Sequence, residues 1–363
     1  MYKSFEVHNY RCFEELKIDD LSLVNLVGGQ NNVGKTALLE AIYCSLRPES
    51  VGWLNALRGL PAPGPSGTPE DSGYAQPEPP WASLFAGFDL DETIVMDATE
   101  ATGESRFLAI SSGPAGLASV GLGAPREAAM PPQVQGLRLG AGNPEMLVLT
   151  QTSGETHKGT YLLVAGPDGV YPWLVEPRVI QERAGFLPAH QRLSSKEEAD
   201  WFSQLLLTGK QGMLTEALRE IEPRLVRLDL LALAGRPLLH GDIGIGRPVP
   251  LALMGEGMNR LAGFVLAIGN AAGGAVLIDE VENGLHHSAL RKMWTVVAAA
   301  ARVFDTQVFA TTHSYECLIA AQRALPAGDF RYLRLQRLKG EIQAVPYEPE
   351  TLDAAIEANL EVR

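Results

Sequence analysis

The stretch that decides the fold is Gly28-Gly29-Gln30-Asn31-Asn32-Val33-Gly34-Lys35-Thr36. It follows the largely apolar run Leu21–Val27 and precedes Ala37–Ile42, which predicts a strand, a glycine-rich loop and a helix. The stretch fits the pattern G-x-x-x-x-G-K-[ST]. Glycines let backbone N–H groups curl around phosphate oxygens, and the start of a helix directs its partial positive charge at the same place. These residues favour a phosphate-binding loop over a chance glycine turn.

The residue types in this loop predict that it binds ATP together with Mg²⁺. Lys35 would reach the β- and γ-phosphates, and the hydroxyl of Thr36 would ligate Mg²⁺. The predicted nucleotide-binding residues of the loop are Gly29, Asn31, Asn32, Gly34, Lys35, Thr36 and Ala37.

A second stretch, Ala275-Val276-Leu277-Ile278-Asp279-Glu280, has four apolar residues followed by two acids. Such a run is typical of a buried central strand, which brings the residues at its end to the ligand-binding edge of a parallel sheet. Asp279 would support Mg²⁺ through Thr36 and water, and Glu280 would polarise a water for in-line attack. A plain acidic turn is the alternative. The presence of both this stretch and the glycine-rich loop in one chain favours the functional interpretation.

His313 comes shortly after the next predicted strand, Gln307–Ala310. Ligands bind outside the carboxyl ends of strands in an open α/β sheet, so we expect His313 near the γ-phosphate or its attacking water. A lone histidine is more often structural, but its position one βα unit after an Asp-Glu pair favours function. The predicted catalytic residues are therefore Lys35, Glu280 and His313.

Gly255 and Gly257 precede another predicted helix, Met258–Ile268. Glycines at the start of a helix form an anion site. Since the Gly29–Thr36 loop already holds one nucleotide, a second site indicates a second nucleotide, most simply one held by a symmetric partner. A plain glycine N-cap is the alternative. The sequence thus predicts a homodimer formed through ATP.

The 363-residue chain has the composition of a soluble globular protein, with 46% hydrophobic and 20% charged residues. Its three cysteines are scattered, which argues against a disulfide framework and for a reducing, cytoplasmic setting. The stretch Leu261–Ile278 is nearly free of polar residues, but glycines in its middle favour a buried helix, a turn and a strand over a membrane span.

A formal net charge of −13 repels nucleic acid on average, so any duplex DNA contact would need a local basic patch. Two groups of residues are candidates, with a solvated face as the alternative for each. They are Arg331, Arg334, Arg337 and Lys339, and Arg178, Arg183, His190 and Arg192.

The predicted fold class is α/β, with a central mixed or parallel sheet, an N-terminal antiparallel sheet and an inserted helical lobe. Residues 1–50 and 245–345 would form the nucleotide-binding lobe, 51–244 the inserted β and helical lobe, and 346–363 a C-terminal tail. Pro- and Gly-rich segments near 60–80 and 113–132 indicate surface loops.

Overlapping capping boxes at Ser194 and Ser195 predict the start of a helix in the inserted lobe. The spacing of its apolar residues places them on one face. They are Trp201, Phe202, Leu205 and Leu206.

These elements in this order resemble an ABC-type ATPase of the SMC and RecF kind. The Walker A loop corresponds to Gly29–Thr36, the Walker B strand to Ala275–Glu280, the signature loop to Met254–Met258 and the switch histidine to His313. The Asp-Glu-x-Glu-x-Gly-Leu-His pattern of the OLD-like (overcoming lysogenisation defect) bacterial ATPases is similar to residues Asp279–His286. Asn9–Phe13 also resembles the opening strand pair of RecF-like proteins. The resemblance covers 1–46 and 250–320 well and the middle weakly.

The resemblance implies a conformational switch in which two chains close head to tail over two ATP molecules and hydrolysis reopens them. Gly255 and Gly257 of one chain would touch the γ-phosphate held by Lys35 of the other. Gly255 replaces the signature serine, and His286 stands where many ABC proteins have an aspartate, so slow hydrolysis is expected. The Q-loop glutamine stays open among Gln133, Gln181 and Gln191.

Full-length OLD proteins also carry a Toprim nuclease, but the acids after His313 lack its strand context, so we expect no nuclease in this chain. Some relatives work beside a separately encoded nuclease or effector. The resemblance therefore implies a role in DNA-linked phage defence or repair with a partner protein. No membrane partner is expected. Two alternatives stay open. One is a nucleotide sensor or scaffold with little hydrolysis. The other is the ATPase subunit of an ABC transporter, which the long interval between Thr36 and Gly255 disfavours.

Three further side-chain groups are weaker candidates. Arg11 is a possible nucleotide contact, and Glu282 is either a second acid near the water or an exposed turn residue. His286-His287 has the composition of a metal pair, but we expect adjacent side chains to point apart and prefer a structural role.

Overall fold

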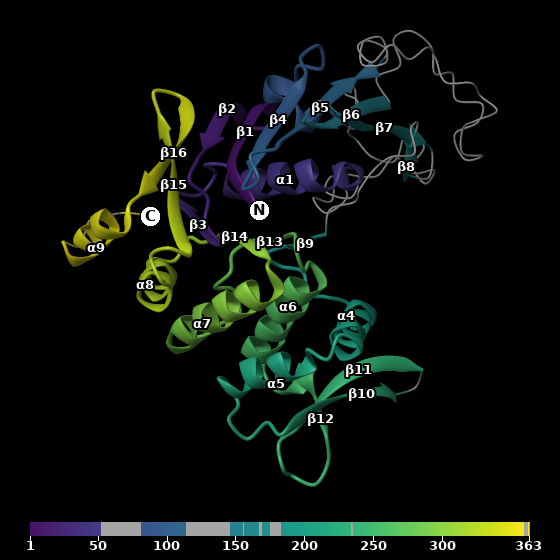
Figure 1. Ribbon diagram of the computed structural model, residues 1–363, viewed down its shortest axis with the longest axis vertical. Helices are drawn as coiled ribbons and strands as arrows, with labels where there is room; N and C mark the ends of the chain where they lie inside the picture. The colour runs from purple at the N-terminus through teal and green to yellow at the C-terminus, as the bar shows by residue number, and fades with distance from the viewer. Residues whose placement is uncertain are drawn as a thin grey trace, which may run out of the picture.

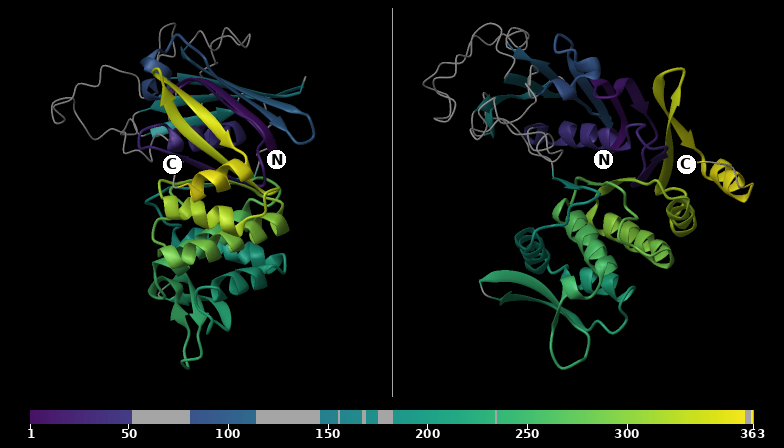
Figure 2. Two further views of the ribbon diagram at one scale, coloured as in Figure 1. Left: turned by 90° about the vertical axis from the view of Figure 1, so that its left-hand side faces the viewer. Right: turned by 180° about the vertical axis from the view of Figure 1, so that it is seen from behind.

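The computed structural model describes residues 1–51, 81–113, 146–154, 156–166, 169–174, 183–233, 235–358 and 362. In this part of the chain, three sheets and several helices are stacked in layers (Figures 1 and 2). The Pro- and Gly-rich segments predicted as surface loops fall almost wholly outside the described residues.

A six-stranded sheet in the order β16-β15-β3-β14-β13-β9 carries the glycine-rich loop. Its strands are β3 (Val24–Gly29), β9 (Ala184–Leu187), β13 (Ala275–Ile278), β14 (Gln307–Thr311), β15 (Phe330–Leu338) and β16 (Glu341–Tyr347). All neighbouring strands run parallel except β15 and β16. β3, β13 and β14 are buried along their whole length, as their apolar runs predict for central strands covered on both faces.

A seven-stranded antiparallel sheet in the order β2-β1-β4-β5-β6-β7-β8 confirms the predicted antiparallel layer. Its strands are β1 (Tyr2–Tyr10), β2 (Phe13–Ile18), β4 (Ile94–Glu100), β5 (Ser105–Ser112), β6 (Met146–Ser153), β7 (Thr156–Gly166) and β8 (Gly169–Leu174). Strand β1 pairs with both β2 and β4, so the chain begins inside this layer.

Helix α1 (Lys35–Leu46) lies between the two large sheets (Figure 1). Every residue from Ala37 to Leu46 is buried, because both faces of the helix are covered. One hydrophobic cluster joins α1 to Phe5 of β1 on one side and to Leu277 of β13 on the other. The helix that follows the glycine-rich loop is therefore fixed from two directions.

The other face of the six-stranded sheet is covered by helices, beyond which lies a small three-stranded sheet (Figure 2). The helices are α4 (Ser195–Leu207), α5 (Gln211–Arg219), α6 (Glu256–Asn270), α7 (His287–Phe304), α8 (Tyr315–Ala324) and α9 (Pro349–Glu357). The small sheet consists of β10 (Arg227–Leu233), β11 (Arg236–Asp242) and β12 (Val249–Pro250). Helix α6, a turn and β13 account for the apolar stretch Leu261–Ile278, and no described helix is both long and apolar enough to cross a bilayer.

Two details of the helical region refine the expectations from sequence. Ser194 caps α4 through a reciprocal capping box with Glu197, as predicted. Leu206, however, is 45% exposed, because the helix turns only Phe202 and Leu205 of the predicted apolar set fully inward.

Strand β9 falls within the segment predicted as the inserted lobe, yet it pairs in parallel with β13. The division into lobes stays a prediction.

Candidate nucleotide-binding site

The glycine-rich loop has two positions that only glycine fits. Gly29 and Gly34 have φ angles of 138° and 89°, which L side chains rarely adopt. A Cβ atom on Gly34 would lie 2.6 Å from Sγ of Cys12, and one on Gly29 would lie 2.4 Å from the carbonyl oxygen of Leu335. Gly34 is also the N-cap of α1 and supplies no side-chain cap, so the first N–H groups of the helix face the loop. This is the backbone shape that phosphate binding requires.

The ammonium of Lys35 folds back over the loop. Its Nζ donates to the carbonyl oxygen of Gly29 at 2.7 Å and to that of Gln30 at 2.9 Å. Burial lowers the pKa of Lys35, while the carboxylates of Asp279 and Glu280 act in the opposite direction. The cation is therefore held at the loop, within the electrostatic influence of the acids that follow β13.

Thr36 and Asp279 meet at the edge of the sheet. Oγ1 of Thr36 donates to Oδ2 of Asp279 at 2.9 Å, and Asp279 is 7% exposed. Oδ1 of Asp279 accepts a second hydrogen bond, from Oγ1 of Thr311 at 2.6 Å. A hydroxyl and a carboxylate are the hard oxygen ligands that suit Mg²⁺. The structure thus brings together the two residues predicted to hold this ion.

Glu280 adopts the left-handed conformation, with φ of 47°, which costs a residue other than glycine roughly 1–3 kcal/mol. Its N–H donates to Oγ1 of Thr311 at 2.8 Å, and its carbonyl oxygen accepts from the N–H of Asn283 at 3.0 Å. Nδ2 of Asn283 also donates to Oε2 of Glu280 at 2.6 Å. Neighbouring groups therefore fix both the backbone and the carboxylate of Glu280.

His313 lies beside the acids that follow β13. Its Nδ1 is 3.2 Å from Oε1 of Glu282 and 3.8 Å from Oε1 of Glu280, and its side chain is half exposed. The backbone N–H groups of His313 and Ser314 donate to Oε1 of Glu282 at 2.9 and 3.1 Å. The side chain of Glu282 is only 10% exposed, so Glu282 is not an exposed turn residue. Its carboxylate holds the segment after β14 through these hydrogen bonds.

The start of α6 forms a separate part of the surface. Gly255 has φ of 107°, and a Cβ atom there would meet nothing within 4 Å. Within the described chain, no hydrogen bond joins Gly255 or Gly257 to the Gly29–Thr36 loop. The two glycines instead lie at the start of a helix that packs on the turn after β13, where a Cβ atom on Gly284 would lie 2.6 Å from Cγ of Glu256.

Arg11 does not extend as a free cation toward the glycine-rich loop. Its Nε lies 3.1 Å from Oε2 of Glu40 on α1, and the two side chains are 6% and 5% exposed. Burial raises the pKa of Glu40 to about 7, although the Arg11 cation acts to lower it. Arg11, a weaker candidate for a nucleotide contact, is thus engaged in a buried ion pair with Glu40.

The histidine pair was predicted to point apart, and this was wrong. The rings of His286 and His287 lie with centroids 4.0 Å apart. His286 acts as the N-cap of α7, where its ring accepts from the N–H of Ser288. Among the described residues, no cluster of three or more His, Cys, Asp or Glu side chains has metal-binding geometry.

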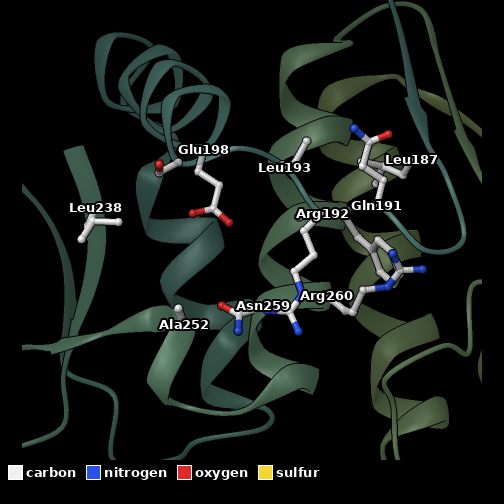
Figure 3. Close-up of a pocket in the computed structure, with 12 residues that line it drawn as sticks. Leu187, Gln191, Arg192, Leu193, Glu198, Leu238, Ala252, Asn259 and Arg260 are labelled. Carbon is white, nitrogen blue, oxygen red and sulfur yellow. The ribbon is translucent and has the colours of Figure 1, made fainter. Parts of the chain in front are cut away.

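Of the three glutamines considered for the Q-loop, Gln133 and Gln181 lie outside the described residues. Gln191 follows the carboxyl end of β9 and lines a cavity of about 370 Å³ with Arg260 and Asn283. It also lines an adjoining cavity of about 190 Å³ (Figure 3). Which glutamine fills the role stays a prediction.

The basic residues considered for DNA contact are partly engaged within the chain. Arg331 lies 3.1 Å from Oδ2 of Asp20 and 2.8 Å from Oε1 of Glu348. Arg192 forms an ion pair with Glu256. Arg178 lies outside the described residues.

Sequence reasoning did not single out Thr311, Asn283 or Arg260, all of which contact Glu280. A signal existed for Thr311. It is a polar residue that follows the apolar run Val308–Ala310, and in the parallel register Ala310 pairs with Ile278. The next residue on each strand, Thr311 and Asp279, therefore had to be neighbours.

Two family models and one curated relative match parts of this chain. Residues 181–318 match a family model described as "AAA domain, putative AbiEii toxin, Type IV TA system". Residues 1–61 match one described as "AAA ATPase domain". A curated relative from Helicobacter pylori, named ATP/GTP phosphatase, is 44% identical over 43 residues. That similarity spans 12% of this chain and 12% of the relative's length.

Solved SMC head domains are also similar to this chain. The head from Thermotoga maritima aligns with a TM-score of 0.47 at 11% identity, over 96% of this chain and 99% of its own. A head bound to the winged-helix domain of ScpA gives 0.46 at 12% identity, over 98% and 99%. The narrower resemblance to OLD-like ATPases stays a prediction. Two stretches of this chain match AAA-type ATPase domains, and they contain the Gly29–Thr36 loop and the Asp279, Glu280 and His313 edge.

Proposed function

We propose that this chain is a Mg²⁺-dependent ATPase that works as a conformational switch. The observation that supports this most directly is the meeting of Thr36 and Asp279, with Glu280 and His313 beside them, at the end of the loop that holds Lys35. The family models described as AAA ATPase domains and the relative named ATP/GTP phosphatase support nucleotide hydrolysis as the chemistry.

Each residue at this edge has a defined task in the proposal. The Gly29–Thr36 loop and the start of α1 bind the phosphates, and Lys35 exchanges its two carbonyl partners for phosphate oxygens. Thr36 and Asp279 would hold Mg²⁺, which when bound neutralises charge on the transferred phosphoryl group. Because Asp279 is buried and doubly hydrogen-bonded, its carboxylate stays in one orientation.

Glu280 orients the attacking water, and His313 senses the γ-phosphate beside it. Oε2 of Glu280 is occupied by Asn283, while Oε1 faces His313 at 3.8 Å, so the carboxylate has one oxygen left to accept from water. The ring of His313 is half exposed, and its Nδ1 lies 3.2 Å from Oε1 of Glu282. Because the backbone N–H of His313 also donates to Glu282, the segment stays anchored when the ring exchanges this contact for a ligand.

The proposal extends to a homodimer that ATP closes. Gly255 stands at an open helix start that makes no hydrogen bond, within the described chain, to its own phosphate loop. A helix start of this kind suits the γ-phosphate held by a second copy. We place this switch in DNA-linked phage defence or repair, beside a partner effector, and the model described with "Type IV TA system" supports a system of more than one component.

The test compares the wild type with Glu280→Gln and with Glu216→Gln, which changes an exposed acid on α5. Phosphate release is measured with and without duplex DNA, and sedimentation velocity follows the dimer with ATP. We expect Glu280→Gln to bind ATP, to form a lasting dimer and to hydrolyse about 10²- to 10⁴-fold more slowly. Turnover by Glu280→Gln equal to that of the wild type would reject the role of Glu280. ATP binding without turnover by the wild type would favour a nucleotide sensor.

A further inference from the structure

Arg260 is a buried cation on the otherwise mainly apolar inner face of α6. It is 8% exposed, and its neighbours on the helix, Leu261 and Phe264, are fully buried. Burying a charge is expensive unless the charge is paired and hydrogen-bonded. The Arg260 guanidinium lies 5.2 Å from the centre of the Phe264 ring, and its Nε has no hydrogen-bond partner within the described chain.

The guanidinium of Arg260 reaches from α6 to the backbone of Glu280. Its Nη2 donates to the carbonyl oxygen of Glu280 at 3.3 Å. The same oxygen accepts from the N–H of Asn283, while the N–H of Glu280 donates to Thr311. A left-handed conformation persists only where the surroundings hold it. Among the described residues, Arg260 is the one side chain of α6 that holds Glu280.

Helix α6 and the turn after β13 are joined at further points. Glu256 packs against Gly284, and Gly257 lies against Leu285, with a Cβ atom on Gly257 placed 3.4 Å from Cδ2 of Leu285. The cavity of about 370 Å³ is lined by Glu256 and Gly284 of this contact and by Arg260. Gly255, at the start of α6, is five residues before Arg260, roughly 7.5 Å along a helix axis.

We propose that Arg260 is a positioning residue that transmits the placement of the start of α6 to the backbone of Glu280 and so sets the direction of the Glu280 carboxylate. The inference rests on the proposed function, since it concerns the residue that orients the water. When a second copy's nucleotide engages Gly255, α6 moves as a rigid body and Arg260 moves with it. Hydrolysis is thereby linked to closure of the dimer.

The kinetic test uses Arg260→Gln and Arg260→Lys, with Arg291→Gln as the control for loss of an exposed cation on α7. We expect Arg260→Gln to lower kcat by about 10- to 100-fold while KM changes by less than about threefold. Lysine keeps a cationic donor and is expected to recover part of the loss, and Arg291→Gln is expected to match the wild type.

A double variant separates positioning from general support of the fold. In single-turnover reactions, Arg260→Gln added to Glu280→Gln is expected to slow hydrolysis by less than about twofold, because Arg260 acts through Glu280. A purely structural role would multiply the two losses, and that result would overturn the proposal. If Arg260→Gln fails to fold, Arg260→Lys is combined with Glu280→Gln in the same way.

Hydrogen exchange without nucleotide tests the contact independently of any ATPase activity. The amides of Val281, Asn283 and Leu285 are bonded within or beside the turn after β13. In Arg260→Gln their exchange is expected to be faster by about tenfold or more, with the amides of β13 unchanged. Equal exchange in both proteins would overturn the inference. If the wild-type protein does not hydrolyse ATP, the proposed function is rejected, but the hydrogen-exchange result still tests the contact between Arg260 and Glu280.

Discussion

The hydroxyl of Thr36 lies 2.9 Å from a carboxylate oxygen of Asp279, a residue 243 positions away in the sequence. Asp279 receives a second hydroxyl, from Thr311, on its other oxygen. The carboxylate is thus held beside the glycine-rich loop by one side chain from α1 and one from β14.

Replacing Thr36 by valine removes the hydroxyl without changing the shape of the side chain. Binding of ATP in the presence of Mg²⁺ is expected to weaken by roughly tenfold or more, because a hydrogen bond to a charged group and a metal ligand are both lost. Binding in EDTA is expected to change little. Calorimetric titrations under the two conditions measure the difference. Thr36→Ser retains the hydroxyl and is expected to behave as the wild type, and equal Mg²⁺ dependence in all three proteins would contradict the assignment.

Thr311→Val is expected to destabilise the fold. The N–H of Glu280 loses its partner, and Oδ1 of Asp279 keeps only the longer hydrogen bond, 3.2 Å, from Thr36. The expected loss is about 1–3 kcal/mol in the free energy of unfolding, measured by urea denaturation. Thr295→Val is the matched control, because its hydroxyl is exposed and bonds only to a carbonyl oxygen of its own helix. A loss no larger than that of the control would show that the bridge contributes nothing.

Gly34→Ala is expected to disable the loop. Gly34 and Gly103 have nearly equal φ angles, 89° and 85°, but a Cβ atom on Gly103 meets nothing within 4 Å. Both alanine variants carry the backbone cost of about 1–2 kcal/mol, and only Gly34→Ala adds the clash with Cys12. Thermal unfolding and ATP titration of both variants separate the two effects. If Gly34→Ala binds ATP as well as Gly103→Ala does, the close packing is not required.

The buried pair of Arg11 and Glu40 predicts a dependence of stability on pH. Burial raises the pKa of Glu40 from 4.5 to about 7, so the folded protein binds a proton that the unfolded chain has released between these values. The associated stability is fully present below pH 4.5 and is lost as the pH rises through about 7.

The glutamine of Glu40→Gln does not titrate, so the wild type is expected to lose about 2.5 kcal/mol of unfolding free energy relative to the variant between pH 5 and 8. Urea denaturation of both proteins across this range measures the difference. The opposite slope would mean that attraction between Arg11 and the Glu40 carboxylate outweighs burial.

Much of the site could be read from local patterns. A glycine that needs a positive φ, a lysine and threonine at a helix start, and an apolar strand ending in two acids each reflect the requirements of a few adjacent residues. The predicted strands at 275–278 and 307–310 and the capping box at Ser194 therefore have counterparts in the structure.

Other contacts could not be predicted from the sequence, because they depend on which strands and helices are neighbours in the fold. Arg11 follows a strand signal that gives no indication of Glu40, and its burial depends on α1 lying between two sheets. In the sequence, Arg260 is one polar residue in an apolar helix. Its contact with Glu280 becomes evident only when α6 is seen to pack on the turn after β13.

By itself, the sequence determined where the chain forms the glycine-rich loop between a strand and a helix, and which acids and histidine follow its central strands, because backbone conformation and apolar periodicity are local properties. Only the tertiary structure decided that Thr311 bridges Asp279 and Glu280, that Asn283 and Arg260 hold Glu280, and that Arg11 is paired with Glu40. Those contacts are set by strand order, register and helix packing, which join residues hundreds of positions apart.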